Sequence, residues 1–215
     1  MKEIEFYHSH LWTDPDCALE PRLETEILVE KIALRHKKNP PEEFADICCG
    51  CGTIGIPLKI ALGNAKVYFV DISSKALELL RKNLSHNHLV GEVFQGDLLD
   101  PLIQQKIKVD LLVCNPPYVA TNEIDLLDAN ALKEPSIALF GGEDGLDFYR
   151  RLAKDLPKVL KKGASVYFEI GFNQGKKLLE LFDHPWYKNQ KVENDYAGHN
   201  RFFSLVFEPS SLLES

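Results

Sequence analysis

The sequence lacks any uninterrupted apolar run that approaches the roughly 20 residues needed to span a bilayer. The opening residues, Met1-Lys2-Glu3-Ile4-Glu5, also lack the apolar core of a signal peptide. We therefore predict a cytoplasmic protein that has no membrane partner.

Cysteine is scarce and unevenly placed. There are five cysteines, an odd number, and Cys48, Cys49 and Cys51 crowd into four residues, a spacing that suits no disulfide framework. This usage favours a reducing compartment. Low-complexity tracts and repeats of fixed period are missing as well, which excludes a solenoid architecture.

An excess of positive charge is also missing. Lys and Arg number 25 against 32 Asp and Glu, which gives a net charge of -7 and argues against duplex nucleic acid as the main or a stable partner. With 215 residues, of which 45% are hydrophobic, the chain has the size and composition of one globular domain spanning 1–215.

Strand and helix patterns alternate along most of the chain, which predicts an α/β fold with a doubly wound sheet of seven strands. The last two strands are joined by a tight turn, so the last strand must run antiparallel to the one before it in a sheet that is otherwise mostly parallel. The long stretch 115–145 is expected to contain a substrate lid. The expected strands are 44–48, 66–71, 92–95, 109–114, 164–170, 190–195 and 202–207, and the expected helices are 24–35, 54–62, one capped by Ser73-Ser74, 146–160 and 174–182.

A glycine-rich turn follows the first of these strands and opens a helix. Gly50-Cys51-Gly52-Thr53-Ile54-Gly55 matches the pattern G-x-G-x-x-G, in which backbone N–H groups approach a ligand closely. Asp71 ends the next strand about twenty residues later, where a carboxylate can accept hydrogen bonds from ribose hydroxyls. Together they predict a cofactor that contains adenosine, either a nicotinamide dinucleotide or S-adenosylmethionine.

The motif Asn115-Pro116-Pro117-Tyr118 follows the most apolar strand, at the sheet edge where open α/β sheets bind ligands. Methyl transfer to a planar nitrogen requires two acceptors for the hydrogens of an NH2 group. Asn115 offers a side-chain carbonyl, and Pro116 offers a backbone carbonyl restrained by Pro117. Tyr118 offers a ring on which a planar amide or base could stack. The motif therefore favours amine or amide methylation over hydride transfer.

Four further stretches accompany this motif: Pro21-Arg22-Leu23-Glu24-Thr25-Glu26, Leu139-Phe140-Gly141-Gly142-Glu143-Asp144-Gly145-Leu146, Phe168-Glu169-Ile170-Gly171 and Asp195-Tyr196-Ala197-Gly198-His199-Asn200-Arg201. With them the sequence resembles the bacterial HemK-type protein-glutamine N5-methyltransferases over nearly the whole chain. The resemblance implies a class I, Rossmann-like fold and S-adenosylmethionine-dependent methylation of the glutamine in the Gly-Gly-Gln loop of peptide chain release factors. It implies that the catalytic residues are Asn115, Pro116, Pro117 and Tyr118. It also implies which residues hold the cofactor. Asp71 would hold the ribose, Asp97 and Leu98 would lie beside the adenine, and Asn115 would also contact the cofactor. The methionine part would be held by Cys48, Cys49, Gly50, Cys51 and Gly52.

Three departures from this family stand out, and one of them is Leu23 in place of the proline that is usual after the Pro21-Arg22 pair. Cys48 occupies the position of a common first glycine, which is tolerable only if its φ is an ordinary one for a side chain. The family's small helical N-terminal domain is expected to be absent, leaving a single catalytic domain, which we expect to be a monomer.

Other interpretations remain open at this stage. The same arrangement of Asn-Pro-Pro-Tyr could hold the amine of adenine in DNA or RNA. The target glutamine could instead belong to a ribosomal protein, or the domain could be a binding module without catalytic activity. Cys48 and Cys51 form a C-x-x-C near Cys114, but the turn they occupy is the one the cofactor would fill. We therefore predict buried or cofactor-lining thiols and no metal.

Overall fold

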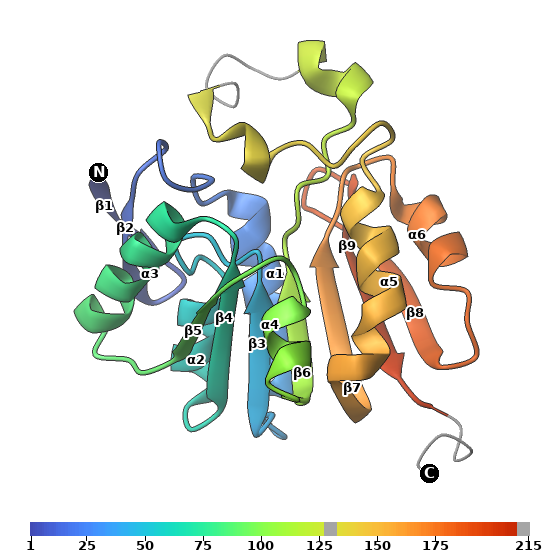
Figure 1. Cartoon of the computed structure of the whole chain (residues 1–215), viewed down its shortest axis with the longest axis horizontal. Helices are drawn as coiled ribbons and strands as arrows, with labels where there is room; N and C mark the ends of the chain where they lie inside the picture. The colour runs from blue at the N-terminus through green and yellow to red at the C-terminus, as the bar shows by residue number, and fades with distance from the viewer. Residues whose placement is uncertain (127–132, 210–215) are drawn as a thin grey trace.

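The computed structural model describes residues 1–126 and 133–209. Its centre is a seven-stranded sheet of order β5-β4-β3-β6-β7-β9-β8 (Figure 1). Neighbouring strands are parallel except that β9 runs antiparallel to both β7 and β8, so the predicted fold class is confirmed. The strands are β3 (Glu43–Ile47), β4 (Lys66–Asp71), β5 (Glu92–Gln95), β6 (Val109–Cys114), β7 (Leu160–Glu169), β8 (Tyr187–Asn194) and β9 (Asn200–Phe207).

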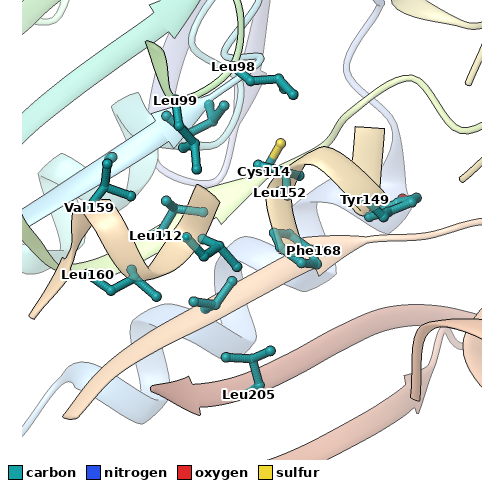
Figure 2. Packing of buried hydrophobic residues seen from close by; sticks show 14 of the residues in the cluster. Leu98, Leu99, Leu112, Cys114, Tyr149, Leu152, Val159, Leu160, Phe168 and Leu205 are labelled. Atoms are coloured by element: carbon teal, nitrogen blue, oxygen red, sulfur yellow. The ribbon is translucent and has the colours of Figure 1, made fainter. Parts of the chain in front are cut away.

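Helices cover both faces of the sheet. Strand β6 is apolar from Leu111 to Cys114 because both of its faces are covered: Leu111 and Val113 enter the core on one face, and Leu112 and Cys114 enter the core on the other. Figure 2 shows the second core, in which Leu112 and Phe168 of the sheet face Leu152 of a covering helix. The first face carries α1 (Leu23–His36), α2 (Gly55–Leu62) and α3 (Ser74–His86), and the second carries α4 (Asp100–Gln104), α5 (Asp147–Val159) and α6 (Gly175–Leu181).

An N-terminal hairpin, which the sequence patterns did not predict, lies outside the main sheet. It consists of β1 (Lys2–Phe6) and β2 (Ser9–Thr13). Its attachment depends on α3, where the Asn83 side chain accepts from Trp12 N at 2.7 Å and donates to Trp12 O at 3.0 Å. A two-stranded ribbon is marginal alone, so this hairpin depends on a contact far away in sequence. The short helix α4 was also not predicted.

The long connection between β6 and α5 crosses above the ends of the central strands (Figure 1). It contains 3₁₀ turns at Thr121–Leu126 and Ser136–Ala138. The stretch 127–132 of the expected lid lies outside the described residues. Across residues 1–126 and 133–209, none of the helices has the length and apolar character required to cross a membrane.

Candidate cofactor and target site

A cavity of about 240 Å³ opens at the carboxyl ends of β3, β4, β5 and β6. The residues that follow these four strands form its floor, which is the location expected for a ligand in an open α/β sheet. Of the predicted site residues, Cys48, Cys49, Gly50, Asp71, Asp97, Leu98, Asn115 and Pro117 line the cavity, whereas Cys51, Gly52, Pro116 and Tyr118 do not.

Asp71 organises the glycine turn from the neighbouring strand. Its Oδ2 accepts from Gly50 N at 2.8 Å and its Oδ1 accepts from Ser73 N at 2.9 Å. Burial raises the pKa of this carboxyl, and the backbone donors oppose that shift. A carboxylate has about four lone-pair sites, so Asp71 can still accept hydrogen bonds from ribose hydroxyls in the cavity.

The backbone of the cavity floor is strained at two side-chain-bearing residues. Cys48 has a φ of 55°, so the condition of an ordinary φ set for a side chain at this position is not met, and Leu98 has a φ of 48°. Cys48 departs from it because the chain turns sharply from β3 into the glycine turn, where Gly50 also has a positive φ of 54°. Left-handed residues of this kind persist where surrounding contacts fix them, and they gather at functional sites.

Asp46 presents an unsatisfied oxygen in the cavity wall. The residue is 1% exposed, its Oδ2 accepts from Gly55 N at 2.7 Å, and its Oδ1 has no partner within the part of the chain that is described. Burial raises the pKa of Asp46 from 3.8 to about 8. In its ionised form the orphaned oxygen suits a ligand with hydrogen-bond donors or positive charge, which would itself favour ionisation, and S-adenosylmethionine carries an ammonium group and a sulfonium.

This carboxyl makes stability depend on pH. Between pH 3.8 and 8 the folded chain holds a proton on Asp46 that the unfolded chain has released, so stability falls as pH rises through this window. We expect Asp46→Asn to remove this dependence, because the neutral amide can still accept from Gly55 N. Urea unfolding should show the wild type losing about 2 kcal/mol more than the variant between pH 6 and pH 8. Equal pH dependence in both proteins would show that Asp46 is already ionised at pH 6.

Part of the cavity wall comes from two segments to which the sequence patterns gave no cofactor role. Residues 17–21 precede α1, and Pro135, Ile137 and Ala138 belong to the connection above the sheet. Glu134 joins them, since its carboxylate accepts from Glu20 N at 3.1 Å and from Arg22 at 2.9 and 3.0 Å. The Pro21-Arg22 motif pointed to a function for this segment, but only through its resemblance to a family and not through any pattern of its own.

We expect Arg22→Gln to speed cofactor dissociation several-fold. The buried Glu134 would keep one backbone donor and lose the Arg22 Nη2 that bonds to both of its oxygens, which weakens the link between the two wall segments. Stopped-flow measurement of S-adenosylmethionine release would check this. Arg150→Gln is the matched control, because Arg150 pairs with Asp144 and Asp147 at the surface. Equal dissociation rates in wild type and Arg22→Gln would contradict this role.

Tyr118 does not line the cavity in this structure. Its ring is half-buried against the core, and its hydroxyl donates to Glu169 Oε1 at 3.3 Å. The hydroxyl of Thr25 donates to the other carboxylate oxygen at 2.7 Å. The structure thus joins Tyr118 to the motifs around Thr25 and Glu169 and does not place its ring where it could stack on a ligand in the cavity.

Three of the cysteines, Cys49, Cys51 and Cys114, are buried near the carboxyl ends of β3 and β6, and Cys48 is partly buried. Cys114 pairs with Ile47 across β3 and β6, so the predicted proximity of Cys48 and Cys114 is confirmed. Burial raises the pKa of Cys49, Cys51 and Cys114, which disfavours the thiolate that metal binding requires. Within residues 1–126 and 133–209, no three His, Cys, Asp or Glu side chains are grouped to hold a metal ion.

Comparison with known proteins identifies the family. The model of the methyltransferase small domain matches residues 22–136. The release factor glutamine methyltransferase of Chlamydia trachomatis is 36% identical over 217 residues, which cover 99% of this chain and 72% of that protein. The chain belongs to the release factor glutamine methyltransferase family. Membership confirms the predicted methyltransferase class and its cofactor, S-adenosylmethionine.

Other members and structures agree with this assignment. The family member from Enterococcus faecalis is 37% identical, over 93% of this chain and 71% of that protein. The crystal structure of a release factor-specific protein-(glutamine-N5) methyltransferase from Alicyclobacillus acidocaldarius is 27% identical, with a TM-score of 0.58, and the match covers 93% of this chain and all of that one. A methyltransferase from Pyrococcus furiosus has a TM-score of 0.68 at 16% identity, covering 94% and 90% of the two chains, and supports the fold alone.

Proposed function

We propose that this chain methylates the side-chain amide nitrogen of a glutamine in a peptide chain release factor, at the Gly-Gly-Gln motif. The observation that carries this proposal is that Asn115 lines the same cavity as Asp71 and Gly50. The cavity therefore contains both a side chain that could bind the target amide, Asn115, and residues that could bind an adenosine cofactor, Asp71 and Gly50. Membership of the family supports glutamine as the target.

The cofactor-holding residues are proposed from their places in the cavity. S-adenosylmethionine supplies a methyl group that is already activated by its positively charged sulfur. Cys48, Cys49 and Gly50 would hold its methionine part, with Asp46 accepting hydrogen bonds, and Asp71 would hold the ribose. Asp97 and Leu98 would lie beside the adenine. The Asp97 carboxylate is oriented by Arg151, whose Nη2 lies 2.6 Å from Asp97 Oδ2.

The protein's remaining task is to orient the target. Asn115 accepts one amide hydrogen through its side-chain oxygen and Pro116 accepts the other through its carbonyl, so the nitrogen is held in a fixed direction. The proposed role of Tyr118 is to fix this loop through Glu169, because its hydroxyl is already bonded there.

A protein substrate also agrees with the charge and the expected location. The net charge of -7 supports a protein target over a stable complex with nucleic acid. A release factor as substrate places the reaction in the cytoplasm, and we propose that the enzyme acts as a monomer.

Mass spectrometry tests the proposal. Incubation of the chain with S-adenosylmethionine and a purified release factor should add one methyl group to the glutamine of Gly-Gly-Gln. Parallel incubations with DNA, RNA and ribosomal proteins serve as comparisons. Methyl transfer only to one of these, or to none of the substrates despite normal cofactor binding, would refute the release factor assignment.

A further inference from the structure

A buried glutamine joins three loops beside the proposed target site. Gln174 is 2% exposed and precedes α6. Its Oε1 accepts from Gly171 N at 2.9 Å, while its Nε2 donates to Tyr118 O at 2.9 Å and to Gly145 O at 3.2 Å. Both amide hydrogens and the amide oxygen are therefore used, each on the backbone of a different loop.

The two loops that receive the hydrogens are already packed backbone against backbone. Val119 N donates to Leu139 O at 2.9 Å, and Gly141 N donates to Val119 O at 2.9 Å. A Cβ at Gly141 would lie 2.6 Å from Pro117 O, and one at Gly145 would overlap Tyr118 O. This close approach explains why glycine stands at both positions, and it leaves Gln174 as the side chain that closes the junction.

We propose that Gln174 is a positioning residue that fixes the loop Asn115 to Tyr118 for methyl transfer. This inference rests on the proposed function of Asn115. Gln174 does not line the cavity, and its amide groups are all bonded to backbone atoms, so its role is assigned to the loop and not to the target. It holds the carbonyl of Tyr118, three residues after Asn115, and a misplacement of about 1 Å can cost on the order of 100-fold in rate.

Gln174→Glu tests this role because it removes both donors and keeps an acceptor for Gly171 N. At neutral pH the new carboxylate would face two carbonyl oxygens and push the loops apart. We expect kcat for glutamine methylation to fall about 100-fold, with the Kd for S-adenosylmethionine within about threefold of wild type. We also expect faster amide hydrogen exchange at Val119 and Gly141. Lower pH should restore part of the activity, because a neutral carboxyl can donate to a carbonyl.

Gln190→Glu is the matched control. The Nε2 of Gln190 donates to Phe182 O at 2.7 Å and Tyr187 O at 3.5 Å, in β8 at the far edge of the sheet. It should lose no kcat and show no recovery at low pH. Substitution at this position controls for the general cost of a carboxylate placed against two carbonyls.

Three outcomes would overturn the inference. A folded Gln174→Glu protein that keeps kcat within about threefold of wild type, or a Gln190→Glu protein that loses as much, would reduce Gln174 to a general structural role. Hydrogen exchange tests the positioning role of Gln174 independently of any measurement of activity. If the wild type methylates no release factor, the proposed function fails, and unchanged exchange at Val119 and Gly141 in Gln174→Glu would still refute the positioning role.

Discussion

Replacing Asn115 by Ala should abolish detectable methyl transfer while leaving cofactor affinity within about tenfold of wild type, a loss below ~1.4 kcal/mol. Asn115 follows β6 and lines the cavity, and its side-chain oxygen is the proposed acceptor for one hydrogen of the target amide. Without it the amide nitrogen is free to rotate away from the methyl group, so the effect falls on kcat. Single-turnover methylation of a release factor and calorimetric titration of S-adenosylmethionine would measure the two quantities separately.

The control for this experiment is Asn64→Ala. Asn64 is exposed in the turn before β4, at the end of the sheet opposite the cavity, so its loss should leave both rate and affinity unchanged. An active Asn115→Ala enzyme would refute the assigned role. A variant that loses turnover and cofactor affinity together would instead place Asn115 in the cofactor subsite.

The floor of the site was predictable because it follows from where the parallel strands end. Strand patterns located the ends of β3, β4, β5 and β6, and parallel strands bring their carboxyl ends to one edge. Residues as distant in sequence as Cys48 and Asn115 were therefore expected together, and both line the cavity. Local periodicity carries this information since each strand needs only its own residues to be recognised.

The walls and supports of the site were not predictable in the same way. Glu134 is a lone acid in a loop, and only the fold brings it to Arg22, 112 residues earlier in the chain. Gln174 is equally ordinary in sequence, and its role depends on carbonyl groups 29 and 56 residues away. The positive φ of Cys48 was also hidden, because the sharp turn out of β3 dictates it and the residue type does not. Contacts of this kind follow from tertiary structure and leave no periodic signal.

Asp71→Asn should weaken S-adenosylmethionine binding about 100-fold or more, which corresponds to at least ~2.7 kcal/mol. In the wild type each carboxylate oxygen accepts a backbone N–H, from Gly50 and from Ser73. An asparagine amide can accept only one of them, because its NH2 group would meet the other N–H donor to donor. The variant would therefore lose hydrogen-bond capacity toward the ribose and would also displace either the glycine turn or the start of α3.

Asp110→Asn separates these effects from the general cost of losing a carboxylate. Asp110 lies in β6, where its Oδ2 accepts from Glu43 N at 3.0 Å and from Lys161 at 3.1 Å, away from the cavity wall. Its amide variant should bind cofactor as the wild type does. Calorimetric titration of the three proteins would measure the difference, and an Asp71→Asn affinity within threefold of wild type would remove Asp71 from the ribose subsite. Because Asp71 holds the turn as well as facing the cavity, a parallel loss of hydrogen-exchange protection at Gly50 N would indicate that turn geometry, and not only the ribose contact, carries the affinity.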